Sequence, residues 1–183
     1  MASSDESRER TERFEALVMP HLDAAYNVAR WMTRNASDAE DIAQEAMLRA
    51  FRFFDTFRGD DGRVWLLTIV RNTYLTWIRR QAPQQNSAEF DERIHTDLEA
   101  AVTPERSVLQ QAKSEDVRRA IEQLPPEYRE VILMREIEEL SYKEMAAITQ
   151  APLGTVMSRL SRARSMLRHL IVKESGLEAK HRG

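Results

Sequence analysis

The stretch LSYKEMAAITQAPLGTVMSRL, residues 140–160, decides the fold of the second half of the chain. It predicts a short helix, a turn at residues 150–154 and the start of a second helix. Two helices that cross closely need a small residue where they meet, and Ala146 stands at that position. The two helices must also share apolar contacts, which these residues provide: Met145, Ile148, Val156 and Leu160. The pattern is typical of a helix-turn-helix.

Two local signals support these boundaries. Ser141 and Glu144 have the spacing of a capping box, which predicts the start of the first helix. Gln150 occupies the turn position that often carries glycine, where a left-handed backbone costs a non-glycine residue about 1 kcal/mol. We expect the turn to tolerate this cost.

The second helix, expected from Thr155 to about Val172, has two unlike faces. Its core face is predicted to consist of Val156, Leu160, Ala163, Leu167 and Leu170. The opposite side carries Ser158, Ser161, Arg162, Ser165 and His169, with Arg159 and Arg168 on the flanks. Residues 155–170 include four arginines and no acid. Short hydroxyls permit close approach and arginines reach bases and phosphates, so this face predicts DNA recognition in the major groove, with a merely solvated face as the alternative.

The first half of the chain predicts three further helices. One is expected over residues 11–33, and a second begins after Asn35-Ala36, with Ser37 and Glu40 as its capping box. The second helix ends in the loop Asp55–Gly62, and a third covers residues 63–81. Residues 83–104 are polar and acidic without an apolar period, which indicates a flexible linker. We therefore predict an all-α fold of two small helical domains, residues 11–82 and 113–175, joined by a linker over 83–112.

Composition narrows the class of protein. The 183 residues include only 5 glycines and no cysteine, and the formal net charge is −3. Disulfides and thiol catalysis are thereby excluded, and a uniformly basic coat protein is disfavoured. The chain has neither a signal-like N-terminus nor an apolar run long enough to span a bilayer, so we expect a cytoplasmic protein without membrane insertion. Four scattered histidines and no catalytic constellation predict no metal, no cofactor and no enzymatic activity.

Several motifs, in order, resemble the extracytoplasmic-function (ECF) sigma factors of bacterial RNA polymerase. In the first domain they are DAEDIAQEAMLRAF (38–51), FRGD (57–60), WLLTIVRN (65–72) and WIRR (77–80). In the second they are LPPEYREV (124–131), SYKEMA (141–146) and GTVMSR (154–159). The resemblance covers residues 14–170 and implies sigma domain 2, a helical bundle, followed by sigma domain 4, the helix-turn-helix.

The resemblance implies a function in transcription initiation. Domain 2 would bind the clamp helices of the largest subunit of core RNA polymerase, and domain 4 the flap region of the second-largest subunit. The expected polymerase-binding residues are Asp38, Glu40, Asp41, Gln44 and Glu45. For Asp38 and Glu40, stabilisation of the helix N-terminus is an alternative role. Relatives are commonly controlled by an anti-sigma factor, so such a partner and a response to stress or another signal are also expected.

The resemblance also assigns promoter DNA to both domains. The minus-ten element would contact Arg58, Gly59, Asp60, Asp61, Thr68, Arg71, Asn72, Thr76, Arg79 and Arg80, with the loop capturing a flipped base. The minus-thirty-five element would contact Thr155, Met157, Ser158, Arg159, Ser161, Arg162, Arg164 and Arg168. Thr76 and Met157 depart from the family pattern, which often has an acidic residue at position 76 and a basic residue at position 157. The apolar side chain of Met157 predicts contact with a thymine methyl group.

Other interpretations remain open. Phe57 and Tyr74 are either core residues or platforms for bases, whereas Trp65 and Trp77 are expected in the core. An autonomous repressor or response-regulator output module would share the helix-turn-helix but not need the first domain. A sigma-factor mimic that sequesters an inhibitor would lose the arginines of the recognition helix, and a recombinase would need a nucleophile that the sequence does not offer.

Overall fold

The computed structural model describes residues 2–59, 61–81 and 114–181, and every regular element in these ranges is a helix. The expected all-α fold is thereby confirmed. The linker predicted over residues 83–112 and the site residue Asp60 lie outside the described residues.

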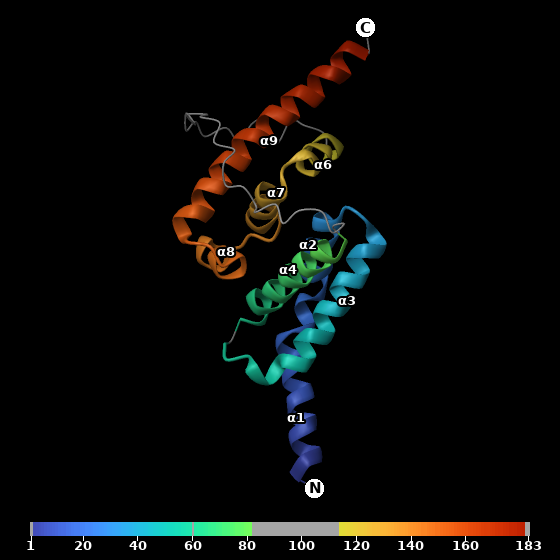
Figure 1. The fold of residues 1–183 in the computed structure, drawn as a ribbon, viewed down its shortest axis with the longest axis vertical. Coiled ribbons are helices and arrows are strands. Elements are labelled where there is room, and N and C mark those ends of the chain that lie inside the picture. Colours follow the sequence, from blue (N-terminus) through green and yellow to red (C-terminus); the bar gives the residue numbers. More distant parts are fainter. Residues whose placement is uncertain (1, 60, 82–113, 182–183) are drawn as a thin grey trace.

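The first domain is a bundle in which α2, α3 and α4 pack together while α1 extends toward the N-terminus (Figure 1). Its elements are α1 (Ala2–Leu17), the 3₁₀ turn η1 (Met19–His21), α2 (Leu22–Thr33), α3 (Ala36–Phe53), the 3₁₀ turn η2 (Phe54–Thr56) and α4 (Gly62–Gln81). Small side chains allow close packing of α2 on α3, and these alanines are buried: Ala25, Ala29, Ala39, Ala43, Ala46 and Ala50.

The prediction of a single helix over residues 11–33 is wrong. The structure has two α-helices there, separated by η1, and the first already begins at Ala2. Pro20 lies in η1. Proline has no backbone N–H and its ring collides with the preceding turn, so an α-helix cannot continue through this position without a break.

The predicted capping box at Ser37 and Glu40 is also wrong. The cap of α3 is Asn35, whose Oδ1 accepts a hydrogen bond from the backbone N–H of Asp38 at 3.2 Å. Asn35 is an equally good cap residue and lies two positions earlier, directly after Arg34, whose φ of 59° ends α2. The tight connection between α2 and α3 therefore sets the start of α3.

Four aromatic residues of the first domain, from the loop before α4 and from α4 itself, pack in its core. Phe57 and Tyr74 are buried, and Trp65 and Trp77 are half-buried against the same cluster. The ring of Phe57 lies 5.0 Å from that of Trp65 and 5.9 Å from that of Phe54, between centroids. The expectation for the two tryptophans is confirmed, and the open alternative for Phe57 and Tyr74 is resolved in favour of packing in this arrangement.

The second domain packs α6 and α7 against the long α9, with α8 across the start of α9 (Figure 1). Its elements are α6 (Ser114–Gln123), α7 (Pro126–Ile132), the π-helical turn η3 (Leu133–Ile137), α8 (Tyr142–Thr149) and α9 (Leu153–His181). The chain changes from α to π geometry between α7 and η3, and α9 is longer than the helix expected from Thr155 to about Val172. Ile171 is fully buried, whereas Leu170, predicted for the core face, is half-buried.

Both local signals of the helix-turn-helix are confirmed. Ser141 and Glu144 form a complete capping box, and Gln150 has φ 54° and ψ 34°, the left-handed conformation. The four apolar residues expected to join the helices are all buried: Met145, Ile148, Val156 and Leu160. The turn therefore brings Val156 and Leu160 of α9 against α8 in the core.

Candidate DNA and protein interfaces

The exposed face of α9 is the first candidate DNA interface. Ser158, Ser161 and Arg162 are exposed, and the side chain of Met157 beside them is 50% exposed. Arg159 and Arg168 are half-buried on the two flanks, as their spacing predicts, and Thr155 is half-buried at the start of the face. The Ser158 hydroxyl donates to the carbonyl oxygen of Thr155 at 3.0 Å, which leaves its oxygen free to accept. This face can therefore offer donors and acceptors to a groove.

Arg164 lies apart from this face. Its Nε and Nη2 donate to Oε1 of Glu136 at 2.9 and 2.6 Å, so the guanidinium is held by the residue before the end of η3. Both side chains are partly exposed, and the pair is therefore a surface ion pair. The contact with the minus-thirty-five element that was predicted for Arg164 would have to compete with Glu136.

The polar stripe of α4 is the second candidate DNA interface. Asn72, Arg79 and Arg80 are exposed on it. The hydroxyls of Thr68 and Thr76 are half-buried and donate to backbone carbonyls one turn earlier, at 2.8 and 2.9 Å. The exposed end of the stripe is thus its C-terminal half.

Arg71, predicted on the same DNA face, points to the second domain instead. It forms a salt bridge from Nε to Oε1 of Glu130 in α7, and its Nη2 lies 3.5 Å from Oε2. The side chains are only 16% and 9% exposed. Burial raises the pKa of Glu130, while the neighbouring guanidinium of Arg71 acts to lower it.

The residues of the loop before α4 differ in how far they are available for the predicted DNA contact. Arg58 and Gly59 are exposed, and Nη1 of Arg58 donates to the carbonyl oxygen of Asp55 at 2.8 Å. Asp61 accepts the backbone N–H of Val64 at 3.0 Å through Oδ1, which stabilises the first turn of α4. Asp61 therefore has a capping role that the sequence analysis did not anticipate.

The predicted polymerase-binding residues lie along α3. Glu40, Asp41, Gln44 and Glu45 are exposed and Asp38 is half-exposed in the first turn. Glu45 is held by Arg49 at 2.7 Å. The exposed ridge continues into apolar residues: Leu48 is 67% and Phe51 42% exposed, four and seven positions after Gln44. Sequence reasoning missed these two, although helical spacing from Gln44 could have found them.

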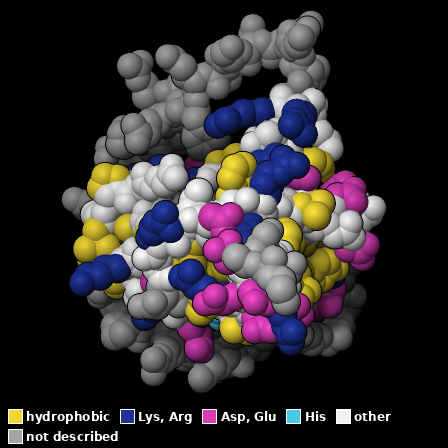
Figure 2. All heavy atoms as spheres, turned by 90° about the horizontal axis from the view of Figure 1, so that it is seen from below, with side chains coloured by type: hydrophobic (Ala, Val, Ile, Leu, Met, Phe, Trp, Pro, Cys, Tyr) yellow, Lys and Arg dark blue, Asp and Glu magenta, His cyan; other side chains and the backbone are white. Residues whose placement is uncertain are grey.

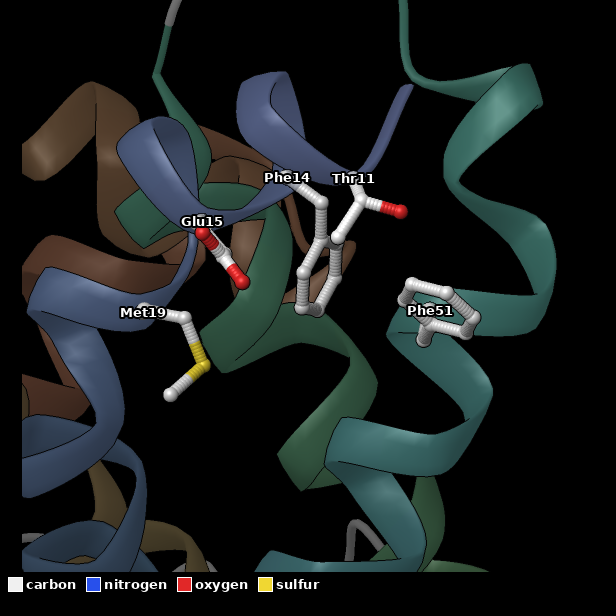
Figure 3. Close-up of a pocket in the computed structure, with 5 residues that line it drawn as sticks. All are labelled: Thr11, Phe14, Glu15, Met19 and Phe51. Atoms are coloured by element: carbon white, nitrogen blue, oxygen red, sulfur yellow. The ribbon is translucent and has the colours of Figure 1, made fainter. Parts of the chain in front are cut away.

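Beside Phe51 the surface is hollowed, with a volume of about 440 Å³. The lining comes from α1, η1 and α3: Thr11, Phe14, Glu15, Met19 and Phe51 (Figure 3). The rings of Phe14 and Phe51 meet edge to face at 5.1 Å, and the guanidinium of Arg10 lies 4.7 Å from the centroid of Phe51. α1 thus fixes the position of an aromatic ring that stays partly open to solvent.

Charge is mixed over the face seen from below, which carries basic, acidic and hydrophobic side chains (Figure 2). Within the described parts of the chain, no three His, Cys, Asp or Glu side chains are placed to share a metal ion. No helix in these described parts has the length and hydropathy needed to cross a bilayer.

Comparison with known proteins finds two family matches, separated by residues 85–113. Residues 17–84 match Sigma-70 region 2, and residues 114–167 match Sigma-70, region 4. The chain is 35% identical over 162 residues to the RNA polymerase sigma-H factor of Pseudomonas aeruginosa, which covers 84% of this chain and 83% of the relative. It is 32% identical over 167 residues to the ECF RNA polymerase sigma factor SigE of Mycolicibacterium smegmatis, which covers 91% of this chain but only 65% of that relative.

A solved structure shows a similar fold. It is a complex of the sigma factor RpoE with the anti-sigma factor NepR from Bartonella quintana. The TM-score is 0.66 at 27% sequence identity, and the likeness covers 87% of this chain and 97% of that chain. The similarity therefore extends through both domains.

Proposed function

Since the chain belongs to the ECF sigma factors, which are transcription initiation factors and not enzymes, we propose that it binds core RNA polymerase and directs initiation at specific promoters. The observation that carries this proposal is the presence of both sigma regions in order, each with exposed polar and basic side chains on the helix proposed to contact DNA, such as Arg79 on α4 and Arg162 on α9. The site of action is the cytoplasm, where bacterial DNA and polymerase are found.

The ridge along α3 is the proposed polymerase-binding surface. It joins exposed acidic side chains, including Asp41 and Glu45, to the exposed apolar pair Leu48 and Phe51. Acidic groups steer a partner of opposite charge, while buried apolar side chains provide much of the affinity at a protein interface. Through this ridge the chain would contact the clamp helices of the largest subunit, while the second domain contacts the flap of the second-largest.

The two domains divide the promoter between them. The domain of residues 113–175 would read the minus-thirty-five duplex with Ser158, Ser161 and Arg162, which are exposed where α9 leaves the turn. The domain of residues 11–82 would hold the minus-ten element along α4 and the preceding loop. Because α4 also exposes arginines at its end, it can bind the phosphates of a separated strand.

An anti-sigma factor is the proposed regulator. A relative of similar fold was solved in complex with one, and that likeness covers both of this chain's domains. Such a partner would respond to a signal, stress among them, and release the sigma factor when transcription is needed.

The direct test is run-off transcription from a genomic promoter library by core polymerase, with and without the purified chain. Specific start sites that appear only with the chain are the expected result. A sigma-factor mimic would neither bind core polymerase nor produce these starts. A folded chain free of any inhibitor that did not bind core polymerase would overturn the proposal.

A further inference from the structure

Glu130 lies at the boundary between the two domains, where it contacts a residue predicted to bind DNA. Arg71 reaches it from α4, and both side chains are largely withdrawn from solvent. The two residues are far apart in sequence and belong to different domains. This ion pair can form only when the domains are packed together.

Glu130 also lies near an arginine of the recognition helix. The charge of Arg159, on the flank of α9, is close enough to favour the ionised form of Glu130, as does Arg71. The ionised form of Glu130 is therefore favoured by one arginine predicted for the minus-ten element and by one predicted for the minus-thirty-five element. Burial nevertheless raises the pKa of Glu130, so the two arginines do not fully offset its desolvation. A contact of this kind favours one arrangement without making it irreversible.

A second ion pair joins the domains near the loop before α4. Nη2 of Arg63 lies 2.6 Å from both the carbonyl oxygen and Oε2 of Glu138. At the other end of the boundary, Nη1 of Arg34 donates to the carbonyl oxygen of Glu122 at 3.3 Å. Between these points α4 packs against α8 and α2 against α7 (Figure 1). The first half of the α4 helix is therefore turned toward the second domain.

We propose that this closed arrangement is autoinhibitory, with Glu130 occupying Arg71 in place of a DNA phosphate. The inference rests on the proposed function, since it requires α4 to bind DNA. A phosphate and the carboxylate of Glu130 compete for the same guanidinium, and a strand along α4 needs the space that the second domain fills. Closure and binding of the minus-ten element therefore exclude each other, and by linkage each weakens the other.

Closure is measured by energy transfer between dyes on Ser7→Cys and Val172→Cys, two exposed positions in a chain without cysteine. Arg71→Glu places two carboxylates together, so the domains separate and transfer falls. Glu130→Arg gives the same fall, and the exchanged pair Arg71→Glu with Glu130→Arg recovers transfer. Arg52→Glu, the same charge change at an exposed site on α3, leaves transfer unchanged.

Circular dichroism of each variant establishes that the helices are intact. If Glu130→Arg unfolds the second domain, the Arg71→Glu variant alone tests the role of the ion pair, because Arg71 belongs to the first domain. If energy transfer is the same in Arg71→Glu as in the unchanged protein, the ion pair is not the contact that keeps the domains closed.

Autoinhibition is tested by locking the closed form. A double variant, Arg63→Cys with Glu138→Cys, is treated with a short bismaleimide that cross-links the two cysteines across the domain boundary. The matched control is the same variant with its cysteines capped by a monofunctional maleimide. Affinity for a mixed-sequence single-stranded oligonucleotide should fall about tenfold on locking, within the range usual for coupled sites. Equal affinity of the two forms would reject autoinhibition.

The run-off assay separates this outcome from failure of the proposed function. A chain that supports specific initiation while its locked form binds DNA as well as the control has the proposed function without autoinhibition. A chain that never supports initiation with core polymerase lacks the proposed function, and autoinhibition is rejected with it.

Discussion

Gly62, the first residue of α4, lies directly against Leu17, the last residue of α1: a Cβ on Gly62 would come within 1.9 Å of the Leu17 carbonyl oxygen. The collision is with backbone, so it cannot be relieved by a side-chain rotation. We expect Gly62→Ala to lower the free energy of unfolding by about 1–3 kcal/mol, as overpacked sites do. Thermal unfolding followed by circular dichroism measures the loss.

Gly154 provides the matched control because it also lies near the start of a helix. A Cβ there would meet nothing within 4 Å. Gly154→Ala should leave stability unchanged or raise it by up to about 1 kcal/mol, since alanine is the better helix former. Equal effects of the two substitutions would contradict the close approach of α1 and α4.

Leu48 should be required for binding to core polymerase but not for folding. Its side chain is 67% exposed, so Leu48→Asp leaves the helices and the melting temperature unchanged. In a complex the new carboxylate would lose its water against an apolar partner, and affinity should fall by about tenfold or more. Binding of labelled protein to core polymerase by fluorescence anisotropy measures this.

Phe53→Asp is the control for that substitution. Phe53 is 52% exposed on the same helix, but it lies five residues beyond Leu48 and faces the opposite side from Gln44. We expect Phe53→Asp to bind polymerase like the unchanged protein. A comparable loss in both variants would move the binding surface away from the proposed ridge.

Arg129 should matter for the stability of the second domain. The side chain is buried, and it donates to the carbonyl oxygens of Ile121, Glu122 and Leu124 at 3.2, 2.9 and 2.8 Å. Burial lowers the pKa of Arg129, yet these carbonyls keep it bound at the end of α6. Arg129→Met leaves them without donors and should cost about 2–3 kcal/mol in chemical denaturation.

Arg118→Met removes an arginine from the same domain at a half-exposed position on α6, where its partners Glu115 and Glu122 are also partly exposed and the ion pairs contribute little. Its denaturation curve should match that of the unchanged protein. If Arg129→Met behaved in the same way, the carbonyls at the end of α6 would not depend on the guanidinium.

Glu136 should limit the contribution of Arg164 to DNA binding. Glu136→Gln removes the competing carboxylate, so binding of a short mixed-sequence duplex should strengthen and depend more steeply on salt, by about one unit of slope. Titrations at several salt concentrations give the slope. Glu139→Gln removes an equal charge from a nearby exposed position, and we expect it to leave the slope of the salt dependence unchanged. An identical response of both variants would indicate only a general charge effect.

Helices and their faces could be predicted wherever the decisive interactions are local. The capping box of Ser141, the left-handed Gln150 and the core stripe of α9 depend on residues within four positions of each other, and helical geometry alone relates them. Local rules were wrong where two signals competed. Asn35 and Ser37 were both adequate caps, and Pro20 interrupted an otherwise continuous apolar period.

The candidate site shows the same division. Sequence placed Ser158 and Arg162 on an exposed face of α9, because the spacing to the core stripe is set within one helix. Sequence could not say that Arg71 faces Glu130 or that Arg164 faces Glu136. Those pairs join residues on different elements, and charge attraction acts between any arginine and carboxylate that packing brings together. Only the tertiary arrangement decides which arginines stay exposed and which are engaged by a carboxylate.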